Sequence, residues 1–267
     1  DSAADEQFQK IAGQPNFYGV LATEELGQRA KLPTQAKPIT PEEIRAVEKQ
    51  PGIRRALAMY RLDLRPEGVK EWSWALRGMS DRQLLAAAEV AQKNQIIDRS
   101  ISAADRTKDE HNYRLRFPTP YADKIMPHSD RQNLDKAWVY GLMRQESRFV
   151  SHARSHVGAG GLMQIMPKIH KDKFEALSPG DWSPLNPEMN MRVGAKIIRE
   201  YTRRTGSVSA GLRWYVGAAI HGNDGGYPGK VLALKSKIDS TYQQGHMVAS
   251  RENGEKVSAV TVAGTEG

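Results

Sequence analysis

The chain has 267 residues, of which 39% are hydrophobic and 26% are charged, so it can form one or two ordinary globular cores. It has no cysteine, which excludes disulfides, thiolate metal sites and cysteine nucleophiles. A net charge of +8 favours an acidic polymer as partner, with a merely soluble basic surface as the alternative. The sequence has no basic arm for nucleic acid and no apolar run of about 18 residues that would predict a transmembrane helix.

The first 31 residues predict a helix pair interrupted at Gly13 and Pro15. A pair of this size cannot bury its own apolar face, so we expect the end of a larger helical assembly or an arm that packs on the next part of the chain. The opening "DSAADEQFQK" lacks the basic-then-apolar order of a signal peptide, which leaves a cytoplasmic protein or one whose signal has been removed. An extended linker comes next, marked by Pro33, Pro38 and Pro41.

A small helical module is expected after this linker. Thr40 before Pro41 predicts an N-cap with proline at the first helical position. Trp72 and Trp74 are expected in the core of the module. The predicted helices cover 41–49, 51–62, 66–77, 80–93 and 95–103.

Pro118 and Pro120 mark a second boundary, and a helix that ends at Glu146 follows it. Further helices are expected near 187–204 and 207–220. Almost no strand-like alternation is present, so the chain is predicted to be mainly α-helical, with a loose C-terminal tail.

Glu146, in "LMRQESRF", is the first candidate for chemistry. It shares a helical face with Val139, Leu142 and Met143, which predicts a partly buried carboxylate. Removal from water raises the pKa of such a group and makes it a proton donor at working pH. The structural alternative is a glutamate tied by neighbouring hydroxyls or by Arg148.

The glycine-rich stretch "ARSHVGAGGLMQIMP" favours the functional interpretation. It places Ser155 and Gln164 nine and eighteen residues after Glu146. Its glycines let the backbone pass close to a ligand or to the glutamate helix. A glutamine between two methionines needs hydrogen-bond partners where it is buried.

These motifs carry a family resemblance. "RQESRF", "ARSHVGAGGLMQIMP" and, more loosely, "LRWYVGA" are similar to the three signatures of the soluble lytic transglycosylases, goose-lysozyme-like enzymes that cut bacterial peptidoglycan between MurNAc and GlcNAc. "FYGVLATEELGQ" and the helical module resemble the last superhelical repeat and the linker domain of the large periplasmic members. The resemblance implies superhelix-end helices and linker at 1–39, a helical linker module at 40–110, a lysozyme-like (goose-type) catalytic domain at 111–245 and a tail at 246–267.

The resemblance also implies roles for single residues. Glu146 matches the catalytic acid/base, and Ser155 matches a residue that contacts the acid or the sugar. Met163, Gln164 and Met166 match residues that line the neighbouring subsites.

Tyr215 matches the tyrosine of the third motif, and its alternative is a core tyrosine on the helix near 207–220. Val216 stands where that motif usually has asparagine, so whatever the amide fixes must be absent or supplied elsewhere.

The expected chemistry depends on the number of carboxylates. Ordinary glycosidases place two around the scissile bond. Near Glu146 no second one is obvious, because Asp172, Glu175 and Asp181 fall in a stretch that is predicted to be a solvated loop. The family's reaction needs one: the acid protonates the glycosidic oxygen and then, as base, helps the MurNAc C6 hydroxyl to close on C1, leaving a 1,6-anhydro-MurNAc end.

Three alternatives remain open: a goose-type muramidase that uses water, a non-catalytic glycan-binding or assembly module, and a nucleic-acid-binding protein. The spacing of Glu146, Ser155 and Gln164 speaks against the last two. His221 and Asp224 are too few ligands for a metal site, even with Tyr227, so neither a metal nor a cofactor is expected.

The expected partners are peptidoglycan strands, to which Trp182 would contribute by stacking on a sugar. Cell-wall or secretion-machinery proteins are further candidates, whereas nucleic acid is not. The resemblance implies a bacterial periplasmic protein whose signal peptide has been removed or lies outside this sequence.

Overall fold

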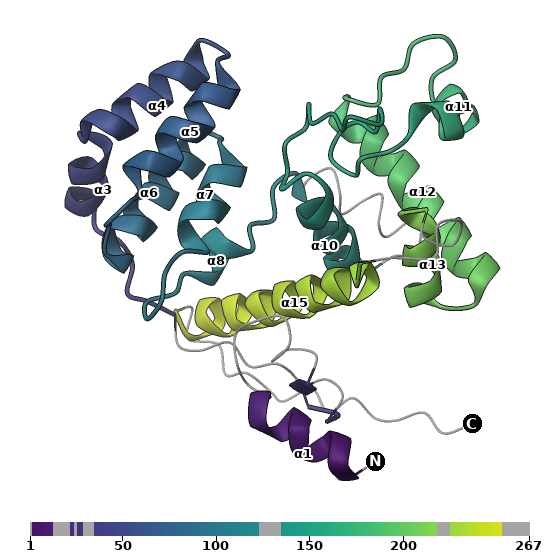
Figure 1. Cartoon of the computed structure of the whole chain (residues 1–267), viewed down its shortest axis with the longest axis horizontal. Helices are drawn as coiled ribbons and strands as arrows, with labels where there is room; N and C mark the ends of the chain where they lie inside the picture. Colours follow the sequence, from purple (N-terminus) through teal and green to yellow (C-terminus); the bar gives the residue numbers. More distant parts are fainter. Residues whose placement is uncertain are drawn as a thin grey trace.

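The computed structural model describes residues 2–12, 22–23, 26–28, 35–122, 135–217 and 225–252. These residues form twelve helices and three isolated β-bridges without a sheet, which confirms the mainly helical prediction (Figure 1). No helix in this part of the chain is both long enough and apolar enough to cross a membrane.

The N-terminal helix α1 spans Ser2–Ile11. It corresponds to the first member of the predicted helix pair. The predicted break at Gly13 and Pro15 lies outside the described residues, so the second member of the pair stays a prediction.

Six helices form the module after the linker, and five of them agree with the predicted ranges to within about two residues. The sixth, α8, is a single short turn that was not predicted. The helices are α3 (Pro41–Glu48), α4 (Pro51–Arg61), α5 (Arg65–Ala75), α6 (Asp81–Lys93), α7 (Ile97–Ala104) and α8 (Tyr113–Arg116).

Side-chain caps define where these helices begin. The Thr40 hydroxyl accepts from the Glu43 backbone N–H, and the Glu43 carboxylate accepts from the Thr40 N–H, so two otherwise unpaired donors are satisfied. Ser80 and Gln83 form the same reciprocal pair at the start of α6. The Thr40 cap is therefore confirmed.

The two tryptophans of α5 have different environments. Trp72 is fully buried, as predicted, whereas Trp74 is 62% exposed with the Arg77 guanidinium 4.0 Å from its ring centre. The prediction for Trp74 was wrong, because residues two apart on an α-helix point to nearly opposite sides and only one can face the core.

The C-terminal half contains the remaining helices, of which α11 and α15 were not predicted. Asp172, Glu175 and Asp181 were expected in a loop, and that expectation was wrong for Asp172 and Glu175, which lie in α11. The helices are α10 (Lys136–Glu146), α11 (Pro167–Glu175), α12 (Pro187–Thr205), α13 (Val208–Tyr215) and α15 (Tyr227–Glu252). Residues 218–220 of the helix predicted near 207–220 are not among the described residues, and α15 runs past the boundary expected at 245.

Helices α10 and α15 pack against each other in opposite directions. In Figure 1, α15 lies below α8 and α10. Asp135, the N-cap of α10, forms an ion pair with Lys235 at 2.9 Å. Near the middle, a Cβ on Gly141 would lie 3.0 Å from the Val231 carbonyl oxygen, so glycine permits the close approach. This pairing brings the end of α10 to the start of α15.

Candidate active site

Glu146 is the last residue of α10, and its side chain is partly buried. The next residue, Ser147, caps the helix with a hydroxyl that lies 2.7 Å from the Leu162 carbonyl oxygen and 3.2 Å from that of Met143. The end of the glutamate helix is thereby fixed to the glycine-rich stretch, as the close spacing of the two motifs in the sequence suggested.

The pKa of Glu146 is raised from 4.5 to about 7. Burial is the main cause, since it disfavours the charged form. Tyr227 opposes this effect, because its hydroxyl donates a hydrogen bond to Glu146 Oε1 and stabilises the carboxylate. The carboxyl group can therefore both donate and accept a proton near neutral pH.

Two tyrosines from different helices flank the carboxyl group. Tyr227 is the first residue of α15, whereas Tyr215 ends α13 and donates to the Met163 carbonyl oxygen at 2.7 Å. Burial raises the pKa of both tyrosines, and the negative charge of Glu146 raises it further. Both hydroxyls therefore stay protonated and act as donors.

The glycine-rich stretch is anchored by Asn190, a fully buried residue of α12. Its amide donates to the carbonyl oxygens of Gly160 (2.9 Å) and Pro184 (2.7 Å), and its Oδ1 accepts from the Met163 N–H (2.7 Å). Gly161 lies in the same bend with φ of +80°, and a Cβ there would lie 2.2 Å from the Pro184 oxygen. The path of the backbone is therefore closely defined.

The other predicted site residues lie in or beside this bend. Ser155 Oγ accepts from the Ala159 N–H at 2.9 Å, and the Gln164 amide donates to the carbonyl oxygens of Ala153 (3.1 Å) and Gly161 (2.9 Å). These polar side chains thus hydrogen bond within the bend.

The two predicted methionines differ in burial. The Met163 side chain is completely buried, and Gly194 of α12 leaves room for its sulfur. Met166, the N-cap residue of α11, is partly exposed.

Two regions match known families. Residues 124–225 match the Transglycosylase SLT domain, and residues 46–109 match the Soluble lytic murein transglycosylase L domain. The chain carries an L domain and an SLT domain of the soluble lytic transglycosylase family. Glu146, the bend and Tyr215 all lie within the SLT match, whereas Tyr227 lies just beyond it.

Curated relatives agree with this assignment. The chain is 26% identical over 211 residues to the soluble lytic murein transglycosylase of Escherichia coli K12, covering 78% of this chain and 32% of the relative. It is 37% identical over 108 residues to the transglycosylase of Enterobacteria phage PRD1, covering 39% of this chain and 38% of that protein. The chain thus spans about a third of the length of these relatives.

Solved structures share the fold. The 70 kDa soluble lytic transglycosylase from E. coli has a TM-score of 0.69 at 23% identity, covering 91% of this chain and 43% of that chain. An inactive glutamate-to-glutamine mutant of the lytic transglycosylase Slt from Pseudomonas aeruginosa has a TM-score of 0.66 at 23% identity, covering 94% and 44%. The likeness extends over both the L and the SLT domains.

The carboxylates considered as a second catalytic group have other surroundings in the SLT domain. Glu175 accepts from Trp182 Nε1 (2.6 Å) and from the Gly180 N–H (2.9 Å). The Asp172 carboxylate forms an ion pair with Lys173, with 3.5 Å between Oδ2 and Nζ, and Asp181 is exposed. Among the residues that the structure describes, Tyr227 alone makes a side-chain hydrogen bond to Glu146.

The Trp182 ring stacks on Phe174, with the ring centres 5.1 Å apart, and its expected stacking on a sugar stays a prediction. Of the residues considered for a metal, His221 and Asp224 lie outside the described residues, and Tyr227 is hydrogen bonded to Glu146. The described residues contain no cluster of three or more His, Cys, Asp or Glu side chains that could hold a metal ion.

Sequence reasoning missed two functional residues, Tyr227 and Asn190. Asn190 left a signal, because it falls in phase with Val193, Gly194 and Ile197 on the buried face of α12, where a polar residue must serve a partner. The sequence around Tyr227 contains no comparable signal apart from the two glycines that precede it.

Proposed function

We propose that the chain is a lytic murein transglycosylase that cleaves the MurNAc-β-1,4-GlcNAc bond of peptidoglycan and leaves 1,6-anhydro-MurNAc ends. The observation that carries this proposal is the carboxyl group of Glu146, which is partly buried, with a pKa of about 7 and a tyrosine donor on one oxygen. One group that can give and then take a proton suits a reaction with an internal nucleophile.

The reaction begins with protonated Glu146. It donates its proton to the glycosidic oxygen while the bond from that oxygen to C1 of MurNAc breaks. The resulting carboxylate then takes the proton of the C6 hydroxyl as the C6 oxygen bonds to C1, and the acid is restored. A hydroxyl of the same sugar has a large effective-molarity advantage over water, so no second carboxylate is required.

Tyr227 is a positioning residue in this scheme, because its hydroxyl stabilises the carboxylate that forms between the two proton transfers. Tyr215 holds the Met163 carbonyl oxygen and thereby the bend beside the acid. The partly exposed Met166 contacts the glycan directly, while Ser155 and Gln164 shape the surface that receives it.

The relatives support this proposal. The E. coli relative is named a soluble lytic murein transglycosylase, and the Pseudomonas structure is of an inactive glutamate-to-glutamine mutant of a lytic transglycosylase. Under this proposal the protein acts in the bacterial periplasm, and cell-wall or secretion-machinery proteins are candidate partners.

The test is a digest of purified sacculi followed by mass spectrometry. We expect muropeptides that are lighter than hydrolytic products by one water molecule and that resist borohydride reduction. Products with reducible ends would instead identify a goose-type muramidase. Val216, the exposed C-cap residue of α13 where the family has asparagine, is where such a change in chemistry would arise.

The assignment of the acid is tested with Glu146→Gln, which keeps the shape of the side chain but cannot donate the proton. Turnover should fall by at least about 10²- to 10⁴-fold. Glu188→Gln is the matched control, because Glu188 is exposed in the same domain, and it should retain parental turnover. A Glu146→Gln protein with a tenth of parental turnover would contradict the assignment, and no turnover by the parent would favour a glycan-binding module.

A further inference from the structure

Helix α12 has a basic face that contains none of the predicted site residues. Lys196, Arg199 and Arg203 follow one another at steps of three and four, so they share one side of the helix over about 10 Å. Together with Glu200 and Arg204 they line a hollow of about 400 Å³, here called the α12 hollow. The apolar side of α12 packs in the core of the SLT half, so the basic face is not needed to bury the helix.

The positive charge of the α12 hollow has little compensation. Its one acidic lining residue, Glu200, is engaged elsewhere, because its Oε2 lies 3.1 Å from Lys173 Nζ of α11. Lys196, Arg203 and Arg204 form no ion pair with any residue that the structure describes. All three side chains are exposed, so these cations are available to an anionic partner.

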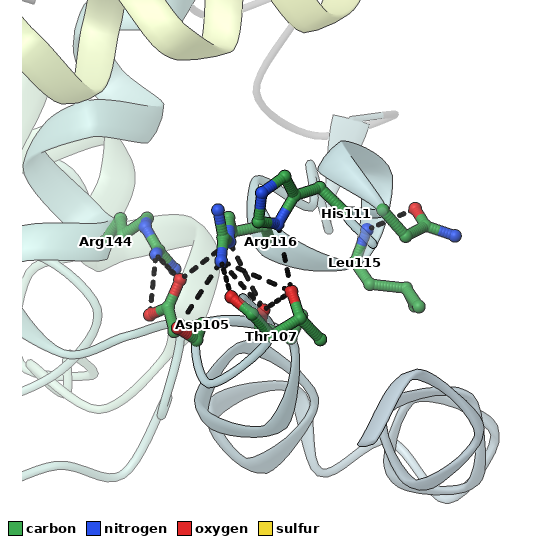
Figure 2. A network of polar contacts seen from close by, with 8 residues as sticks. Asp105, Thr107, His111, Leu115, Arg116 and Arg144 are labelled. Carbon is green, nitrogen blue, oxygen red and sulfur yellow. Dashed lines mark hydrogen bonds and ion pairs between the residues drawn. The ribbon is translucent and has the colours of Figure 1, made fainter. Parts of the chain in front are cut away.

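The buried arginines at the junction of the L and SLT halves are in a different situation. Arg144 and Arg116 both face the Asp105 carboxylate, at 3.2 Å and 3.5 Å (Figure 2). Arg116 also donates to the Ala104 carbonyl oxygen at 3.1 Å. Arginines that hold the fold together are therefore paired with acceptors of the chain, in contrast to the three cations of the α12 hollow.

An aromatic pair orients one of these cations. The guanidinium carbon of Arg204 lies 5.1 Å from the centre of the Trp214 ring, and the edge of this ring packs against Tyr201, with ring centres 5.7 Å apart. A guanidinium held over a ring by cation–π attraction is already ordered, so it loses less side-chain entropy on binding a ligand. Trp214 is 40% exposed, so the stacked pair lies at the surface.

The chemistry of the α12 hollow favours an oxyanion that projects from a polymer. Arginine binds carboxylate and phosphate oxygens through its fork of N–H groups. A hollow receives a projecting group better than it receives a flat bilayer, and an interfacial helix buries its apolar face in lipid, whereas the apolar face of α12 is in the protein core. Under the proposed function the polymer is peptidoglycan. Its N-acetylated sugars are uncharged, so its negative charges are the carboxylates of the stem peptides.

We infer that the α12 hollow binds stem-peptide carboxylates of peptidoglycan and so holds the protein on the polymer at a second place. The inference rests on the proposed function for the identity of the polymer, and it adds a contact that the reaction at Glu146 does not use. Strands that still carry their peptides should be held more tightly than strands from which the peptides have been removed.

The test measures binding without cleavage, using the full chain with Glu146→Gln. Uncrosslinked glycan strands are coupled to a sensor by one end, either with their stem peptides or after an amidase has removed them. Lys196→Gln combined with Arg203→Gln should lower the affinity for peptide-bearing strands roughly tenfold, because two exposed ion pairs are lost. Peptide-free strands should bind the chain equally with and without these two changes.

Arg54→Gln combined with Lys93→Gln is the matched control, because it removes the same two kinds of charge from exposed positions of the L domain. This variant should bind peptide-bearing strands like the unaltered chain. Equal weakening by the control, no loss of affinity in the α12 variant, or no effect of removing the peptides would overturn the inference.

Anionic phospholipid vesicles and duplex DNA are the competing partners. Tighter binding of either one than of the strands, lost on changing Lys196 and Arg203, would overturn the inference in favour of a membrane or a nucleic acid. Turnover is measured separately with the unaltered chain. A chain that cuts no peptidoglycan would contradict the proposed function, while preferential binding of peptide-bearing strands through α12 would still support the inference.

Discussion

At the scale of single residues, the proton affinity of Glu146 results from two opposing influences. Burial alone would favour the neutral acid, while the hydrogen bond from Tyr227 favours the carboxylate, and the pKa lies at about 7 between them. The second influence comes from a residue that contributes no proton of its own, because burial and the charge of Glu146 raise the pKa of Tyr227. The tyrosine can therefore be altered without removing the acid.

Tyr227→Phe should raise the pKa of Glu146, because the charged form loses its hydrogen bond while burial remains. The alkaline limb of the pH–rate profile should move to higher pH. Turnover should fall on the order of 10- to 100-fold, since the carboxyl loses its orienting partner. A purely structural role of Tyr227 would lower turnover without moving the alkaline limb.

Glu146→Gln should also change stability in a pH-dependent way. The folded-state pKa of about 7 exceeds the reference value of 4.5, so the parent binds more protons when folded and loses stability as pH rises from about 4.5 to 7. At about 1.4 kcal/mol per pKa unit, the loss is about 3 kcal/mol. The amide has no such loss, so denaturant titrations should find the variant more stable than the parent at pH 8 and similar at pH 4. Equal stability at pH 8 would contradict the raised pKa.

The partial burial of Glu146 could be predicted from the sequence because its signal was local. Glu146 followed an apolar stripe at helical spacing, and this spacing fixed both its side of the helix and its partial burial. Tyr227 could not be predicted, since its role depends on how two distant helices meet. Contact of Ser155 with the acid or the sugar, and of Gln164 with a subsite, stays a prediction, and the hydrogen bonds that both side chains make within the bend required coordinates.

At the scale of elements, the bend that carries these residues depends on two glycines with different surroundings. Gly158 and Gly161 both have positive φ, +93° and +80°. A Cβ on Gly158 would meet nothing within 4 Å, whereas one on Gly161 would lie 2.2 Å from the Pro184 oxygen and 2.3 Å from the Asn190 amide nitrogen. An alanine at Gly158 would therefore introduce backbone strain alone, whereas an alanine at Gly161 would introduce backbone strain and steric clashes.

Gly158→Ala should cost about 1–2 kcal/mol of unfolding free energy, from positive φ alone. Gly161→Ala carries the same strain and adds overpacking of about 1–3 kcal/mol, and it should displace the bend and lower turnover. Denaturant titrations and turnover of both variants provide the measurement. Equal losses of stability in the two variants would mean that the groups around Gly161 can move aside for the added methyl group at no cost.

The helices differed in how far the sequence predicted them. The helices of the L domain begin at strong N-terminal signals, such as the caps at Thr40 and Ser80, so their starts were visible. Helix α11 was missed because His170 has non-helical angles (φ −118°, ψ 25°) and interrupts its regular pattern. Helix α15 was missed because its apolar residues run consecutively from 231 to 234 rather than at helical spacing.

At the scale of the whole molecule, two hydrophobic cores share helices at their junction. Ile101 of α7 and Tyr113 of α8 belong to the core of the SLT half, while Ala104 of α7 and Leu115 of α8 belong to that of the L half. The ion pair between Asp105 and Arg144 lies at this junction. The two halves should therefore unfold together.

Asp105→Asn should weaken this coupling, because it leaves the buried Arg144 guanidinium without a charged partner. The Asp105 side chain is 35% exposed, so the expected loss is on the order of 2 kcal/mol, below that of a fully buried pair. Calorimetry should find a lower melting temperature and a broader or split transition. Asp109→Asn, an exposed position on the same connection, should melt like the parent. An unchanged single melting transition of the Asp105→Asn variant would mean that the two hydrophobic cores, and not this ion pair, make the L and SLT halves unfold together.

The antiparallel meeting of α10 and α15 has a consequence for when the protein becomes active. Glu146 and Tyr227 are 81 residues apart in the chain, and the tyrosine opens the last of the described helices. During synthesis the carboxyl group is therefore made long before the hydroxyl that stabilises its charged form. A growing chain carries an incomplete site until α15 has been made and has docked, so under the proposed function the full capacity to cut the cell wall arises only after that docking.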